Sequence, residues 1–154
     1  PHPHVWFQGT FGVLLPGPGW MYFAPTFHAQ KMYARAAGTF PLRVESVSSL
    51  PWHLQEPDLT ATLSEDERTL RIYAVNSTAE TLPVTFDLSG FAREVNNGRI
   101  IYIADRDKSL SAEVMNTRDD PNRVAAVDRP LIVRGKKFLF SFEPLSVCLL
   151  ELRM

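Results

Sequence analysis

The chain has 154 residues, of which 45% are hydrophobic and 21% charged, and its formal net charge is -1. This length can enclose one hydrophobic core, and the absence of a basic block or an aromatic-and-basic stripe argues against nucleic-acid binding. No apolar run approaches the roughly 20 residues that a membrane-spanning helix needs. The first ten residues lack the charged start and apolar stretch of a signal peptide, so a cytoplasmic location is expected.

The first 24 residues combine two histidines with several aromatic residues and a Pro-Gly-Pro-Gly turn. His2 and His4 have a spacing that could hold a metal from a strand. The other interpretation is a terminal segment without a site, and we predict no metal and no cofactor. Phe11 to Leu15 is predicted to form a short buried strand.

One helix is predicted, from Pro25 to Ala37. Proline suits the first helical position because its missing N–H costs nothing there. Four residues recur at helical spacing on one face, and Gly38 fits the position just past the end. These four are Ala29, Met32, Tyr33 and Ala36. The stripe is interpreted as a packing face.

Three segments in the middle of the chain alternate apolar and polar residues with period two, the pattern of half-buried strands. They are Leu59–Leu63, Leu70–Ala74 and Leu82–Leu88. Short polar turns join them, so we expect an antiparallel meander.

Further strands are expected on both sides of the meander, at Leu42–Val44, Ile100–Ile103, Ala112–Met115, Leu131–Val133, Phe138–Phe142 and Val147–Leu152. Asn96-Asn97-Gly98 is a turn signal, and Asp105 to Asp120 reads as a long polar loop. Eight or nine strands and one N-terminal helix predict a mainly β protein, an antiparallel β-sandwich whose two sheets cover each other's apolar faces. The single cysteine, Cys148, lies in the last apolar run and is interpreted as a buried, inert thiol.

Four segments resemble, in the same order, the C-terminal part of the α-L-arabinofuranosidases of glycoside hydrolase family 51. They are Met21–Thr39, Val75–Gly90, Met115–Val124 and Phe140–Leu152. One departure falls in the third segment, where Arg118 stands at a position that is often aromatic in the family.

The resemblance implies a division of the chain. Residues 1–38 would be the last strand, loop and helix of a catalytic (β/α)8 barrel, and residues 39–154 a jelly-roll-like sandwich packed against it. The implied partners are the upstream barrel, a second copy of the chain in a homo-oligomer, and arabinose-containing glycans bound by the full enzyme.

The family's retaining hydrolysis uses two glutamates about 5 Å apart, both upstream of the matched region. The chain's own glutamates are interpreted as solvated surface carboxylates, so no catalytic residue is predicted. Those considered are Glu45, Glu56, Glu65, Glu67, Glu143 and Glu151. The resemblance implies that Gln8 matches a glutamine near the sugar.

Two residues have open interpretations. Trp52, in a loop, can stack on a sugar or cover an edge of the sandwich. Asn76-Ser77-Thr78 fits the glycosylation pattern, but without a secretory signal we interpret it as a turn.

The favoured hypothesis is an accessory sandwich that braces the barrel of an arabinofuranosidase and is not catalytic alone. The alternative is a stand-alone carbohydrate-binding or protein-interaction module, which needs an exposed aromatic platform among Trp6, Trp20 and Trp52.

Overall fold

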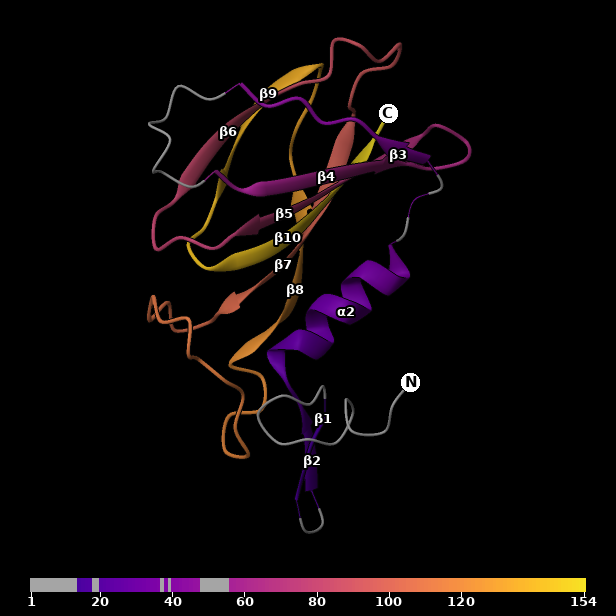
Figure 1. The fold of residues 1–154 in the computed structure, drawn as a ribbon. Helices are drawn as coiled ribbons and strands as arrows, with labels where there is room; N and C mark the ends of the chain where they lie inside the picture. Colours follow the sequence, from indigo (N-terminus) through magenta and orange to yellow (C-terminus); the bar gives the residue numbers. More distant parts are fainter. Residues whose placement is uncertain (1–13, 18–19, 37, 39, 48–55) are drawn as a thin grey trace.

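The computed structural model describes residues 14–17, 20–36, 38, 40–47 and 56–154. Within these, a six-stranded antiparallel sheet of order β3-β4-β5-β10-β7-β8 faces a two-stranded sheet, β6-β9 (Figure 1). A hairpin, β1-β2, precedes the single described helix, α2. The bounds are β1 Leu14–Gly17, β2 Trp20–Phe23, α2 Pro25–Arg35, β3 Phe40–Leu42, β4 Asp58–Leu63, β5 Thr69–Asn76, β6 Leu82–Asp87, β7 Asn97–Asp105, β8 Val124–Leu131, β9 Lys137–Phe142 and β10 Ser146–Arg153.

Strand β10 lies in the middle of the large sheet, and both of its faces are covered. It pairs with β5 on one side and β7 on the other, so that Leu150 lies opposite Ile72 and Ile100. Leu149 and Leu150 point to opposite faces, yet both are fully buried. A strand buried on both faces needs a continuous apolar run. This explains why the last predicted strand, Val147–Leu152, is apolar on both faces.

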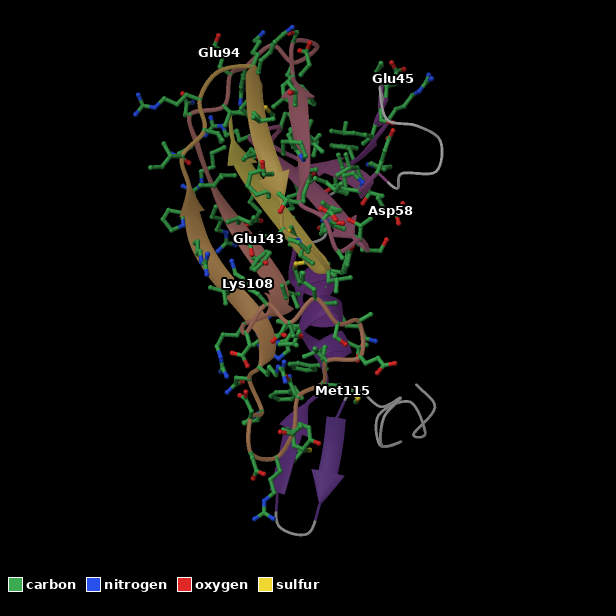
Figure 2. The ribbon with its side chains drawn as sticks, turned by 90° about the vertical axis from the view of Figure 1, so that its left-hand side faces the viewer. Glu45, Asp58, Glu94, Lys108, Met115 and Glu143 are labelled. Carbon is green, nitrogen blue, oxygen red and sulfur yellow. The ribbon has the colours of Figure 1, made fainter. Side chains whose placement is uncertain are left out.

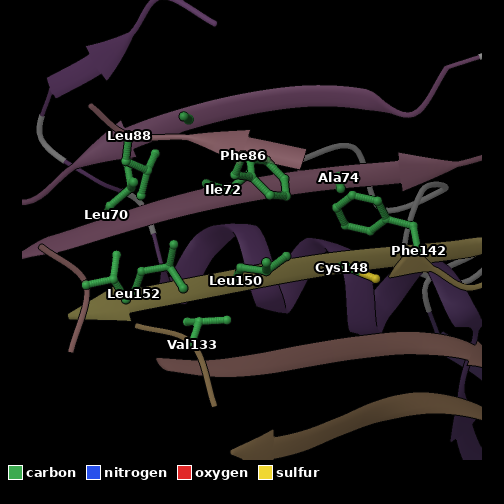
Figure 3. Packing of buried hydrophobic residues seen from close by; sticks show 12 residues of the cluster. Leu70, Ile72, Ala74, Phe86, Leu88, Val133, Phe142, Cys148, Leu150 and Leu152 are labelled. Carbon is green, nitrogen blue, oxygen red and sulfur yellow. The ribbon is translucent and has the colours of Figure 1, made fainter. Parts of the chain in front are cut away.

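The inner core lies between the two sheets (Figure 3). We define the inner face of the large sheet as the face that carries Leu70, Ile72, Ala74, Cys148, Leu150 and Leu152. The small sheet closes it with aromatic residues: the rings of Phe86 and Phe138 stack at 5.1 Å, and Phe142 is 1% exposed. Burial raises the pKa of the Cys148 thiol to about 11, in line with the inert thiol that was expected.

The predicted meander is wrong in its third strand. β4 and β5 are antiparallel neighbours as expected, but β6 pairs with β9 in the other sheet. The side chain of Asn76, at the end of β5, turns the chain away from the sheet. Its Oδ1 accepts a hydrogen bond from the Thr78 backbone N–H at 2.9 Å, and its Nδ2 donates to the Glu143 carbonyl at 2.9 Å.

Three local predictions after the meander also fail. Asn97 and Gly98 do not form a turn but begin β7, where a Cβ on Gly98 would lie 2.9 Å from the Glu151 carbonyl oxygen. This glycine allows close approach between strands instead of a reversal. No strand occurs at 112–115. The strand predicted at Leu131–Val133 overlaps β8 at one residue, because β8 runs from Val124 and ends at Leu131.

The helix begins at Pro25 as predicted and ends at Arg35, two residues early. Gly38 packs where an added methyl group would overlap the Thr62 side chain, so its small size serves a close contact with β4. The predicted mainly β sandwich with one N-terminal helix is confirmed. Within the described residues no helix has the length and apolar character needed to cross a membrane.

Candidate functional site: the outer face of the large sheet

Among the described residues, α2 is the helix that covers the outer face of the large sheet, opposite the inner face (Figure 1). Met32 and Ala36 are 4% and 5% exposed and pack on Tyr73, Ile103 and Leu149. The stripe predicted from helical spacing is therefore a packing face.

Two tyrosines mark the edge of this contact. The rings of Tyr33 and Tyr73 stack at 4.8 Å, and the Tyr73 hydroxyl donates a hydrogen bond to the Ala36 carbonyl. Burial raises the pKa of Tyr73. Tyr33 stays 41% exposed, so the helix leaves part of its stripe uncovered.

A row of charged side chains crosses four strands of the outer face. Glu151 on β10 accepts hydrogen bonds from Arg71 on β5, at 2.8 Å, and from Arg99 on β7. Arg99 also pairs with Asp128 on β8 at 3.1 Å. Burial raises the pKa of the Glu151 carboxyl, but the two arginine hydrogen bonds outweigh it and leave the pKa below its ordinary value. The interpretation of Glu151 as a solvated carboxylate is wrong, because its side chain is only 11% exposed.

A largely apolar groove opens where α2 begins. It has a volume of about 820 Å³ and lies between the first turn of the helix, the ends of β5, β7 and β10, and the loop 106–123. Its apolar wall includes Ala29, Ile103, Leu110, Val114 and Val147. Volumes of roughly 300–1,000 Å³ are typical of binding clefts.

A polar cluster occupies one end of the groove (Figure 2). The Tyr102 hydroxyl donates to Glu143 at 2.5 Å, and the Lys108 ammonium lies 3.3 Å from the same carboxylate. The hydrogen bond from Tyr102 holds the pKa of Glu143 below its ordinary value, helped by Lys108 and opposed by burial. Burial raises the pKa of Tyr102. Glu143 is thus half-buried and paired, which corrects its interpretation as a solvated carboxylate.

Ion pairs fix both ends of the loop 106–123. Arg123 donates two hydrogen bonds to Asp105, at 3.0 and 3.1 Å. Arg106 donates to Asp120 at 2.7 and 3.3 Å. The hydrogen bonds from Arg123 depress the pKa of Asp105 strongly. A loop held in this way presents its side chains in a fixed arrangement.

Asn116 joins the same loop to the N-terminal hairpin. The residue is 1% exposed. Its Nδ2 donates to the carbonyl oxygens of Phe23 and Val124, both at 2.9 Å, and its Oδ1 accepts from the Val124 N–H at 2.7 Å. Every polar atom of the buried amide is therefore bonded, and the segment before α2 is tied to the start of β8.

Neither substrate-binding candidate can be located. Gln8 and Trp52 lie outside the described residues, as do His2, His4 and Trp6. No group of three or more metal-ligating side chains occurs in the described part of the chain. Glu45, Glu56, Glu65 and Glu67 are exposed, as interpreted.

The residues that organise the outer face were not found from the sequence, although signals existed. Glu151 is the one charge inside an apolar strand, and such a residue needs a buried partner. Asn116 lies in a segment that carries the family resemblance, but its role is visible only once Phe23 and Val124 are beside it.

No protein-family model matches the chain, and no curated protein matches it by sequence. Solved structures do match. An arabinose-bound GH51 α-L-arabinofuranosidase gives a TM-score of 0.78 at 19% identity, over 95% of this chain and 22% of that enzyme. An α-L-arabinofuranosidase from Thermotoga maritima in complex with arabinose gives 0.70 at 18% identity, over 94% and 32%. A family 51 enzyme from Bifidobacterium longum gives 0.62 at 20% identity, over 93% and 29%.

The TM-scores of these three matches establish a shared fold. The chain has the fold of one part of the GH51 arabinofuranosidases, and it spans less than a third of each of the three enzymes. The resemblance seen in the sequence is confirmed at this level.

Proposed function

We propose that the chain is the end of the catalytic barrel and the accessory β-sandwich of an α-L-arabinofuranosidase, and that the sandwich braces the barrel. The observation that carries this proposal is the extent of the structural match. It covers 95% of the chain at a TM-score of 0.78 but only 22% of the arabinose-bound enzyme. The match therefore takes in the segment before the sandwich as well as the sandwich.

The outer face supports a bracing role. In the proposed division, residues 1–38 belong to the barrel and residues 39–154 to the sandwich, so α2 would be the last barrel helix. Met32 and Ala36 bury that helix on the sandwich, and Asn116 ties the preceding hairpin to β8. Apolar packing and a buried hydrogen-bond lock together would hold the two parts in one orientation.

Hydrolysis would be carried out by the full enzyme. The nucleophile and the acid/base would be two glutamates of the barrel upstream of this chain, about 5 Å apart as retaining glycosidases require. Gln8 would lie near the sugar at the end of the last barrel strand. The substrate would be a glycan with terminal arabinofuranosyl groups.

The test is to isolate the native polypeptide that carries this sequence, measure its mass, and assay it on 4-nitrophenyl α-L-arabinofuranoside. A chain several times heavier than 17.4 kDa that releases nitrophenol is the expected result. A native chain whose N-terminus lies near Pro1, or a larger chain without this activity, would overturn the proposal.

The stand-alone carbohydrate-binding module has no described feature in its favour. Two of its three platform candidates, Trp6 and Trp52, lie outside the described residues, and of Trp20 only the backbone in β2 is described. A change in tryptophan fluorescence on adding arabino-oligosaccharides would support the stand-alone module.

A further inference from the structure

The loop 106–123 is longer than a simple connection between neighbouring strands requires. It joins β7 to β8, which are paired along their length, and irregular loops beyond roughly 12–15 residues are uncommon unless they serve a function. Its tip is a closed bend: the Thr117 N–H donates to the Asp120 carbonyl, and the Asp120 N–H donates to the Thr117 hydroxyl, both at 3.1 Å. Arg118 and Asp119 form the exposed tip of this bend.

The loop extends beside the β1-β2 hairpin. The bond from Asn116 to the Phe23 carbonyl joins the loop to the end of β2. Leu110 and Val114 of the loop line the same groove as the first turn of α2. In Figures 1 and 2 the loop and the hairpin both project beyond the first turn of the helix, away from the sandwich. The bend at Thr117–Asp120 therefore lies at the N-terminal end of α2.

In a (β/α)8 barrel, the N-terminal end of each helix lies at the catalytic face. Each helix runs back along the barrel, so its first turn lies at the face where the strands end, and the loops that lead into the helices build the active site at that face. If α2 is the last barrel helix, as the proposed function holds, the β1-β2 hairpin belongs to one of these loops. The loop 106–123, tied to the hairpin, then lies at the catalytic face as well.

We propose that the bend Thr117–Asp120 of the sandwich contacts the polysaccharide main chain beyond the arabinofuranosyl group that is cleaved. This inference rests on the proposed function and adds a specificity-determining surface to it. Asp119 is an exposed carboxylate that can accept hydrogen bonds from sugar hydroxyls. The ion pairs of Arg106 and Arg123 hold the bend in place, so little ordering entropy is lost when a glycan binds.

The experiment uses the full native polypeptide with the variant Asp119→Ala, assayed on arabinan and on 4-nitrophenyl α-L-arabinofuranoside. The small substrate cannot reach beyond the cleaved sugar. The variant is expected to raise KM for arabinan roughly 2- to 10-fold, the effect of losing about one hydrogen bond, with kcat unchanged. Both constants for the small substrate should stay at wild-type values.

Glu65→Ala is the matched control, since it also removes one exposed carboxylate. Glu65 lies in the β4-β5 turn, two residues after Leu63. Leu63 pairs with Phe40 of β3, the strand that follows the C-terminal end of α2. It should leave KM for both substrates unchanged. Asp119→Asn, which keeps the shape and one acceptor, should shift KM for arabinan in the same direction by less.

The outcomes separate the two proposals. If wild type hydrolyses both substrates but Asp119→Ala leaves KM for arabinan unchanged, or shifts both substrates equally, the contact is wrong and the proposed function stands. If wild type hydrolyses neither substrate, both proposals fail.

Discussion

The two faces of the large sheet are built differently. The inner face is apolar along β5 and β10 and is closed by the aromatic residues of β6 and β9. The outer face carries a row of paired charges and two stacked tyrosines, and an open groove lies beside the first turn of the helix that covers this face in the described residues. The inner face therefore holds the larger hydrophobic core. The outer face combines a small core with polar contacts that hold the helix and the N-terminal hairpin in place.

The largest effect is expected from truncating neighbouring leucines on β10. Leu150 points to the inner face and Leu149 to the outer face, and both are 0% exposed. Leu150→Ala should lower the free energy of unfolding by about 3–5 kcal/mol, because the packed sheets cannot close the cavity. Leu149→Ala should cost less, about 2–3 kcal/mol, because one helix can settle into the space. Urea denaturation measures both values, and a larger loss for Leu149→Ala would reverse the ranking of the two faces.

Glu151→Gln should cost about 1–3 kcal/mol, since it leaves Arg71 partly buried beside a neutral amide. In the wild type the lowered pKa of Glu151 stabilises the fold above the ordinary glutamate pKa of about 4.3. That contribution is lost as the pH falls through the lower pKa of the folded state.

The pH dependence distinguishes this pair from a merely destabilising change. The difference between wild type and Glu151→Gln should be greatest at neutral pH and shrink as the pH falls below about 4.3. Urea midpoints at several pH values provide the measurement, with the exposed Glu65→Gln as control. A difference that is constant with pH would show that the charge of Glu151 is not involved.

Asn116→Ala should cost about 2–3 kcal/mol, because it leaves the buried N–H and carbonyl of Val124 without partners. Asn116→Asp keeps the acceptor for the Val124 N–H and loses the donor to the Phe23 and Val124 carbonyls. Hydrogen exchange provides the readout. The Val124 amide should lose protection in the alanine variant and keep more of it in the aspartate variant, and equal protection in both would contradict the lock.

The smallest effect is expected at the rim of the groove. Leu110 is 55% exposed and has a φ of 54°, a left-handed conformation that asparagine tolerates better than leucine. Leu110→Asn should change the free energy of unfolding by less than about 0.5 kcal/mol. A thermal melt checks this, and a loss above about 1 kcal/mol would place Leu110 within the core of the outer face.

Local patterns predicted the elements better than their partners. Period two identified β4, β5 and β6, and helical spacing identified the buried stripe of α2, because both depend on the nearest face of the core. The pairing of β6 was missed, since its partner β9 lies far along the chain. β8 was mostly missed because, as an edge strand, it is largely exposed and lacks apolar alternation.

The outer-face site was predictable only in part. The helix stripe was found, but Glu151 and its partners Arg71 and Arg99 are 80 and 52 residues apart, and no spacing rule connects them. Gln8 and Trp52 remain predictions.

The amide of Asn76 has a consequence for the choice of expression host. Its Nδ2 is the atom to which an N-linked glycan would be attached, and here the atom donates to the Glu80, Phe142 and Glu143 carbonyls at the junction of the two sheets. A sugar added to the nascent chain in a eukaryotic secretory pathway would occupy the space where that junction must close. Material secreted from such a host should separate by mass into a bare, folded form and a glycosylated, misfolded one. Replacing Thr78, the third residue of the glycosylation motif, instead of Asn76 would avoid the second form while keeping the amide.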